Sequence, residues 1–85
     1  MYDGLVARLR LFASAREAAG TSQETLPGST VGELLEAAKH KFGPNFVAVL
    51  PSCKVWVNGE AADLGARIDD DDEVAVLPPV SGGDR

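Results

Sequence analysis

The sequence has only one cysteine, no long apolar run and few basic residues. The single Cys53 excludes a disulfide framework, a cysteine-bound iron–sulfur cluster and any zinc or redox site built on paired cysteines. No apolar run approaches the roughly 18–20 residues that span a bilayer. Eight Lys and Arg against thirteen Asp and Glu give a formal net charge of −5. This balance argues against a nucleic-acid binder, which needs a basic face to displace counterions.

The composition is that of one small folded domain. The chain has 85 residues, of which 45% are apolar and 25% charged, so it can bury a modest core but is too short for a second domain. Residues 1–4 carry no basic-then-apolar pattern. We therefore expect a cytoplasmic protein that acts without a membrane.

Four segments have the pattern of β-strands. Residues 5–12 alternate so that the apolar side chains at odd positions share one face, the expected core face. Residues 23–26 predict a short return strand near a sheet edge. Residues 54–57 and 73–77 predict two later strands, and Asn58-Gly59 between them is typical of a two-residue hairpin turn, because both turn positions need positive φ.

One well-defined helix is expected after the second strand. Thr30 and Glu33 have the spacing of a capping box, apolar residues then recur at helical spacing, and Gly43-Pro44 ends the run. Residues 13–20 predict a shorter helix, whereas residues 45–51 show no pattern that assigns an element.

This order of elements predicts an α+β fold. A hairpin, a crossover helix and later strands form a β-grasp, or ubiquitin-like, arrangement. We expect a mixed sheet of four to five strands with one main helix packed across one face. The expected domain is residues 1–79, and residues 80–85 are expected to form a flexible C-terminal tail that carries Gly82-Gly83.

Four sequence segments resemble the MoaD family, the small subunits of molybdopterin synthase within the wider group of ThiS/MoaD sulfur carriers. The similarity covers nearly the whole chain, and its most specific parts are the start and the tail. A terminal Gly-Gly pair alone is weak, since flexible linkers also carry such pairs. The matching segments are RLRLFASAREAAG, VWVNG, DEVAVL and LPPVSGG.

The resemblance implies a sulfur carrier for molybdenum cofactor biosynthesis whose reactive group is the α-carboxylate of Gly83. In that family an adenylating enzyme activates this carboxylate with ATP, and sulfur replaces AMP to leave a thiocarboxylate. The small subunit is then a co-substrate with no bound cofactor or metal. The implied partners are the large subunit of molybdopterin synthase, the E1-like adenylating enzyme and a sulfurtransferase.

The tail has the composition that such delivery requires. Gly82 and Gly83 lack a Cβ and can enter a narrow channel, while Pro78 and Pro79 stiffen the exit from the last strand. Residues 80–83, extended, reach roughly 13–14 Å. By the resemblance, Val80 and Ser81 would line the channel of the large subunit.

Asp84 and Arg85 depart from the family, whose mature chains stop at the second glycine. An arginine side chain would not pass where glycine is required. Three explanations remain open: a peptidase removes both residues, the protein has lost carrier function and acts as a binding module, or the two residues come from an expression vector. We favour removal by a peptidase.

A partner surface is expected beside the tail. Val76 and Leu77 end the last strand there, followed by Pro78 and Pro79. If Val55 and Val57 face the helix, Trp56 shares the opposite face with Arg8, Arg10 and Phe12, a mixture of aromatic and basic residues that suits a protein interface. The alternative is that the strand alternates the other way and Trp56 belongs to the core.

Other functions are weaker alternatives. The same tail chemistry would serve thiamin, cysteine or tRNA thiolation, and a ubiquitin-like binding module would need no thiocarboxylate. The aspartates of residues 69–72 lack the ligand spacing of a calcium loop and predict a solvated turn. Cys53 has no evident activating group, so we interpret it as a small apolar residue rather than a nucleophile.

Overall fold

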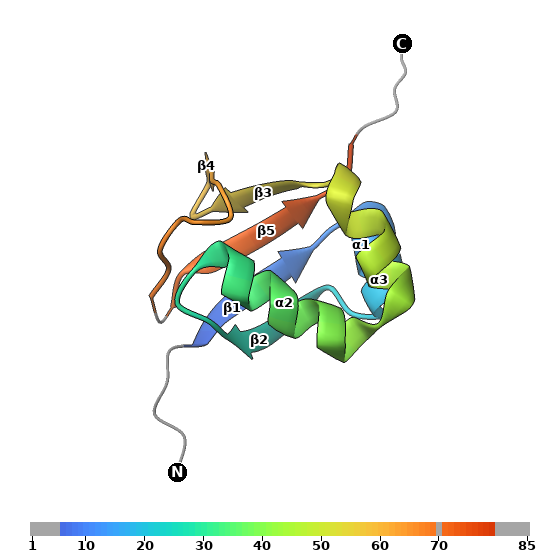
Figure 1. Ribbon diagram of the computed structural model, residues 1–85. Coiled ribbons are helices and arrows are strands. Elements are labelled where there is room, and N and C mark those ends of the chain that lie inside the picture. Colours follow the sequence, from blue (N-terminus) through green and yellow to red (C-terminus); the bar gives the residue numbers. More distant parts are fainter. Residues whose placement is uncertain (1–5, 70, 80–85) are drawn as a thin grey trace.

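A mixed five-stranded sheet carries helices on one face (Figure 1). The structure is a computed structural model that describes residues 6–69 and 71–79. Within those ranges the strands lie in the order β2-β1-β5-β3-β4. Their bounds are β1 Val6–Leu11, β2 Gln23–Pro27, β3 Lys54–Val57, β4 Glu60–Ala61 and β5 Glu73–Leu77.

The two central strands, β1 and β5, run parallel, and the remaining neighbours are antiparallel. β1 and β2 form the first hairpin, with Leu9 opposite Glu24. β3 and β4 form the second hairpin, closed by Asn58 (φ 50°) and Gly59 (φ 87°), as the Asn-Gly pair predicts. This arrangement confirms the expected β-grasp fold and places β2 at a sheet edge.

Helix α2, Val31–Phe42, is the main helix and crosses one face of the sheet (Figure 1). Thr30 caps it by accepting a hydrogen bond from the Glu33 N–H at 3.2 Å. The Glu33 carboxylate reaches back to Ser29, whose N–H and hydroxyl both donate to it at 2.9 Å. The expected capping box is therefore present, with the return bond made one residue earlier than the usual pattern.

Three shorter elements surround the end of α2. Helix α1 spans Ala13–Ala19 and ends at Gly20 in the left-handed conformation (φ 81°). Helix α3, Pro44–Val49, and the 3₁₀ turn η1, Leu50–Ser52, occupy the segment that the sequence pattern left unassigned. Phe46 of α3 is fully buried, which explains the apolar character of this connection.

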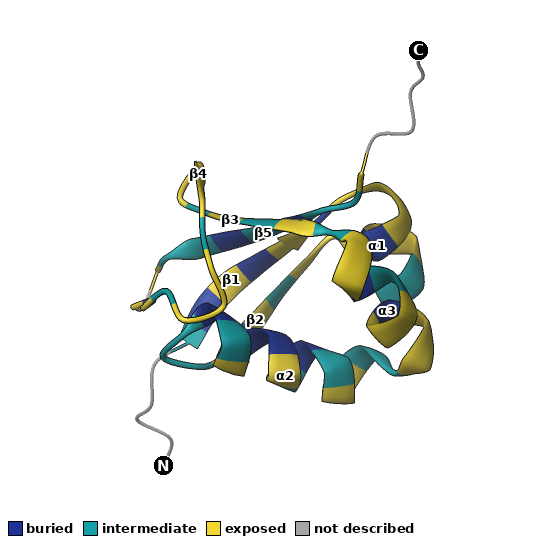
Figure 2. Cartoon of the chain, turned by 45° about the horizontal axis from the view of Figure 1, so that its top comes forward, coloured by how far each residue is buried: buried dark blue, intermediate teal, exposed yellow. Residues whose placement is uncertain are grey.

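The core lies between the sheet and the helices (Figure 2). The odd positions of β1 face it, as predicted, together with alternate residues of β5 and the apolar face of α2. No helix in the described ranges has the length and apolar character needed to cross a membrane. The buried core consists of Ala7, Leu9, Leu11, Ala15, Leu26, Val31, Leu34, Leu35, Ala38, Phe46, Leu50, Ile68, Val74 and Val76.

Candidate functional site

Strand β5 lies in the middle of the sheet, and the C-terminal tail follows it in the sequence. We call the end of this strand the exit of the tail. The strand lies between β1 and β3 and ends at Leu77. Pro78 and Pro79 follow and cannot donate to a neighbouring strand because they have no N–H. The predicted tail residues Val80, Ser81, Gly82 and Gly83 lie outside the described residues, so the site can be followed as far as Pro79.

A shallow groove of about 490 Å³ lies beside this exit, on the face of the sheet away from α2. Strand alternation turns Trp56 outward, opposite Ala75 of β5, and the small Ala75 side chain leaves a hollow next to the indole. Leu77 pairs with Lys54 in the next outward row. We call this the outer groove; it is lined by Phe12, Lys54, Trp56, Gly59, Glu73, Ala75, Leu77, Pro78 and Pro79.

The structure brings five of the predicted partner-binding residues together in the outer groove: Phe12, Trp56, Leu77, Pro78 and Pro79. The neighbours of Trp56 in β3 pack against the core. Trp56 itself remains 38% exposed, as does Phe12. The outward orientation of Trp56 is therefore confirmed and the core alternative is wrong, while its role in partner binding stays a prediction.

Val76 does not belong to this surface. Its side chain is fully buried with Val74 in the core, because β5 alternates and Val76 shares the inward phase of Val74. The prediction that Val76 contacts a partner directly is therefore wrong. Its contribution is to hold β5 against the helices while Leu77, one residue on, faces the groove.

Sequence reasoning missed Lys54, Gly59, Glu73 and Ala75 as groove residues. The period of two in β3 and β5 was the available signal: once Trp56 and Leu77 face outward, Lys54 and Ala75 must do so too. What the sequence could not supply is the β3–β5 register, which sets Trp56 opposite Ala75.

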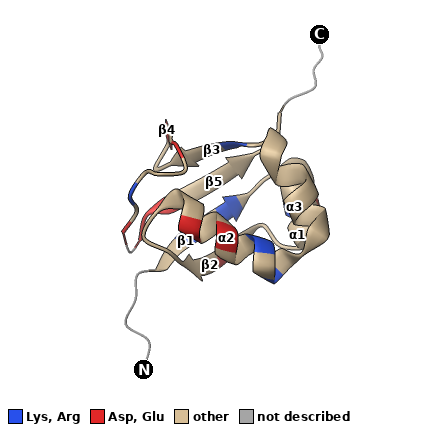
Figure 3. Ribbon diagram, viewed as in Figure 1, with Lys and Arg blue, Asp and Glu red and all other residues tan. Residues whose placement is uncertain are grey.

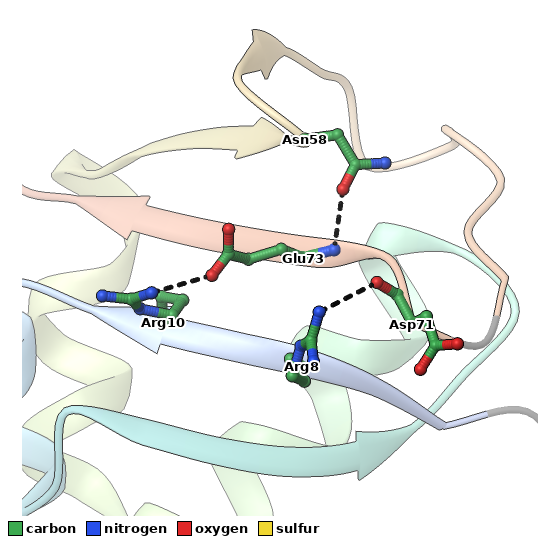
Figure 4. Close-up of polar contacts among 5 residues, drawn as sticks. All are labelled: Arg8, Arg10, Asn58, Asp71 and Glu73. Atoms are coloured by element: carbon green, nitrogen blue, oxygen red, sulfur yellow. Dashed lines mark hydrogen bonds and ion pairs between the residues drawn. The ribbon is translucent and has the colours of Figure 1, made fainter.

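Polar contacts fix the β1 side of the groove (Figure 4). The Arg10 guanidinium forms an ion pair with Glu73 at 3.0 Å. Its Cζ also lies 5.8 Å from the centre of the Phe12 ring, within cation–π range. Arg8 donates to the backbone carbonyl of Asp71 at 3.4 Å. Arg10 therefore links Phe12, an aromatic residue of the groove, to Glu73 of β5 on an exposed surface.

Comparisons with known proteins show the family to which this chain belongs. Residues 9–83 match the ThiS family. The chain is 36% identical over 81 residues to the molybdopterin synthase sulfur carrier subunit of Phaeosphaeria nodorum, covering 85% of this chain and 84% of that protein. It is 35% identical over 79 residues to the subunit of the same name from Arabidopsis thaliana, covering 89% and 81%.

Among solved structures, the chain resembles small archaeal modifier protein 1 from Haloferax volcanii. The TM-score is 0.82 at 34% identity, covering 92% of this chain and 99% of that one. This chain belongs to the ThiS family. The resemblance to ThiS/MoaD carriers that the sequence motifs indicated is thereby confirmed.

The ThiS family match extends through Gly82 and ends at Gly83. Asp84 and Arg85 lie beyond it. The family match thus includes both glycines of the predicted tail, and the reactive role of Gly83 stays a prediction.

The described part of this ThiS-family chain offers no cluster of His, Cys, Asp or Glu that could hold a metal ion. The aspartate turn is held internally: Asp72 accepts hydrogen bonds from Asn58 Nδ2 at 3.0 Å and from the Asp69 N–H at 2.8 Å. These two bonds, that of Asn58 first, hold the pKa of Asp72 below its ordinary value. The turn precedes β5, at the opposite end of that strand from the groove exit.

A larger hollow of about 840 Å³ lies on the helix side, between α2, η1 and the β3–β4 hairpin. It includes no residue of β5, but it shares Lys54 and Trp56 of β3 with the outer groove. Cys53 lines it and donates to the Val49 carbonyl at 3.3 Å. Burial raises the pKa of this thiol, which disfavours the thiolate that a nucleophile requires.

Proposed function

We propose that this chain is a sulfur carrier in molybdenum cofactor biosynthesis, the small subunit of a molybdopterin synthase. After Asp84 and Arg85 are removed, the carboxylate of Gly83 is adenylated with ATP by an E1-like enzyme, with release of pyrophosphate. Sulfur at the oxidation level of sulfide then attacks the acyl carbon, displaces AMP and leaves a thiocarboxylate, which donates this sulfur to the pterin precursor in the large subunit. The place of action is the cytoplasm.

The outer groove carries this proposal. Its apolar residues Trp56, Leu77 and Phe12 border the strand that leads into the tail, so a partner seated on the groove would receive the tail at the same time. Tryptophan is among the side chains most enriched at the energetic centres of protein interfaces. The similarity to two molybdopterin synthase sulfur carrier subunits supports the same assignment.

The chain acts in this scheme as a co-substrate and not as a catalyst. Activation belongs to the adenylating enzyme, sulfur supply to a sulfurtransferase, and pterin chemistry to the large subunit. The remaining partner in this scheme is a peptidase that removes Asp84 and Arg85. Neither a nucleic acid nor a membrane takes part.

Adenylation of defined C-termini tests the reactive position. We expect protein ending at Gly83 to support pyrophosphate release by the adenylating enzyme from the same genome, and full-length protein to be inert. A form ending at Gly82 is the matched control for tail length. Equal activation of the full-length form would overturn the requirement for trimming.

Intact mass of the protein from its own host is the decisive first measurement. Loss of Asp84 and Arg85, with a fraction showing sulfur in place of oxygen, is the expected result. A mass that retains both residues throughout would instead favour a binding module without carrier function.

Protein modification is a second candidate, favoured by the similarity to small archaeal modifier protein 1. The same activated carboxylate would then form an isopeptide bond with lysines of other proteins. Conjugates that carry the Gly83 remnant on lysine, detected by peptide mass spectrometry, would support this use. Their absence alongside a thiocarboxylate would leave sulfur transfer as the function.

A further inference from the structure

We propose that Lys54 selects an acidic partner surface, by forming an ion pair with a carboxylate of the large subunit beside the outer groove. This inference rests on the proposed function and goes beyond it, because it specifies the charge of the surface that the groove accepts. The argument comes from the distribution of charge over the two faces of the sheet.

The outer face is basic although the protein is acidic. The chain carries a net charge of −5. The register places Arg8, Arg10 and Lys54 on the outer face with a single carboxylate, that of Glu73. The neighbouring β2 residues on this face, Gln23 and Thr25, are neutral. Among the described residues of β1, β2, β3 and β5, Glu73 is thus the one carboxylate on this face, and Figure 3 shows basic residues on β1 and β3.

The three cations of this face differ in how far they are already neutralised. Arg10 is paired with Glu73 at 3.0 Å. Arg8 donates to a backbone carbonyl, that of Asp71, beside a turn rich in aspartate. Lys54 forms no ion pair with any residue of the described ranges. Arg8 also forms no ion pair there, but its guanidinium is engaged by the Asp71 carbonyl. Lys54 differs from both arginines because, within the described ranges, its side chain forms neither an ion pair nor a hydrogen bond, so its charge is available to a partner.

Lys54 is also placed where a partner must approach. It lies opposite Leu77 in the last paired row of β3 and β5, and Pro78 and Pro79 follow directly. Its side chain is exposed and borders the outer groove. A partner that covers Trp56 and Leu77 would bring its own rim close to this ammonium group, where a carboxylate is attracted and a lysine or arginine is repelled.

Binding of the large synthase subunit from the same genome, measured by calorimetry, tests this inference. We would use the full chain and the form ending at Gly83, each with Lys54→Gln and Lys54→Glu. We expect the first substitution to weaken binding about two- to fivefold, the range of an exposed ion pair. Charge reversal should weaken it by about tenfold or more, and Lys54→Arg should retain it.

The matched control is Lys41, a lysine at the end of α2 on the other side of the sheet. It pairs loosely with Glu24 at 3.9 Å. Lys41→Gln and Lys41→Glu make the same changes in net charge, and we expect less than twofold effects. Raising NaCl from low to high concentration should weaken wild-type binding more than binding of Lys54→Gln, because screening acts on the ion pair.

Four outcomes separate the inference from the function on which it rests. Parallel losses in the Lys54 and Lys41 variants would show a general charge effect and overturn the role of Lys54. Unchanged affinity in Lys54→Glu, with binding lost in Trp56→Ala, would overturn it while leaving the docking groove in place. Absence of wild-type binding would overturn the proposed function and this inference together. If sedimentation shows that Lys54→Glu disrupts a dimer of this chain, the groove binds a second copy and the inference is wrong.

Discussion

Asn58 and Glu73 are joined by two hydrogen bonds that tie the second hairpin to the start of β5, and Figure 4 shows the one accepted by the Asn58 side chain. The Asn58 N–H donates to the Glu73 carbonyl at 2.8 Å, and the Glu73 N–H donates to Asn58 Oδ1 at 3.0 Å. This contact continues the β3–β5 ladder by one residue. It therefore fixes the register that sets Trp56 opposite Ala75 and forms the outer groove.

Removing the Asn58 side chain should weaken this connection. Asn58→Gly keeps the positive φ of the turn (50°) and loses both side-chain bonds, to Glu73 and to Asp72. We expect the free energy of unfolding to fall by about 1 kcal/mol in urea titrations. Asn58→Asp should lower the free energy of unfolding further at neutral pH, because it places a second carboxylate beside that of Asp72. Equal stability of wild type and Asn58→Gly would contradict the role of the side chain.

Acid should destabilise the protein through Glu33. Hydrogen bonds from the N–H and hydroxyl of Ser29 hold the pKa of Glu33 below its ordinary value of 4.5. The folded state thus binds fewer protons than the unfolded state, so the stabilisation is present above that value and is lost as the pH falls through the folded pKa. Unfolding monitored from pH 6 downward should show this decline. Glu33→Gln should reduce this decline and leave the part that Asp72, whose pKa is also lowered, contributes. Ser29→Ala should reduce it less, and an unchanged slope in Glu33→Gln would refute the assignment.

Phe46 should be a principal contributor to stability. Its side chain is fully buried and packs edge-to-face on Phe42 at 5.2 Å between ring centres. Phe46→Ala should lower the free energy of unfolding by about 3–5 kcal/mol, and Phe46→Leu by less. The neighbouring Val47 is 40% exposed, so Val47→Ala is the control. It should change the free energy of unfolding by less than about 1 kcal/mol. Similar losses in both would argue against α3 as part of the core.

Gly28 should not tolerate a side chain. A Cβ there would lie 2.7 Å from the Leu34 backbone nitrogen, and a helix backbone cannot give way as a side-chain end can. We expect Gly28→Ala to cost about 3 kcal/mol or more in thermal or urea unfolding. At Gly20, in the left-handed conformation at φ 81°, the same substitution meets open space, and only the conformational cost of about 1–2 kcal/mol applies. An equal effect at both positions would show that the contact with α2 is not limiting.

Trp56 should dominate docking of the large subunit. Trp56→Ala removes the largest apolar side chain of the outer groove and should raise the Kd at least about tenfold. Leu64 is more exposed, at 61%, but lies outside the outer groove, so Leu64→Ala should leave the Kd within about twofold. Equal affinities for the two variants in calorimetry would place the interface elsewhere. Circular dichroism of each variant separates lost binding from lost folding.

The sequence by itself determined the local elements, and its resemblance to the ThiS/MoaD carriers predicted the chemistry of the tail. Alternation in β1, the capping of α2 at Thr30 and the Asn58-Gly59 turn are short-range effects, and each follows from neighbouring residues. The segment that forms α3 escaped prediction because it is short and its Phe46 is buried by contacts distant in sequence. Local periodicity cannot show those contacts.

The tertiary structure decided which side chains form the groove. Strand register and the face covered by α2 depend on long-range pairing, and a shift of one residue exchanges the two faces of a strand. That pairing buries Val76, turns Trp56 outward and leaves Lys54 beside the tail exit. The sequence therefore predicted which glycine carries the reactive carboxylate, whereas the surface expected to present it to a partner required the packed sheet.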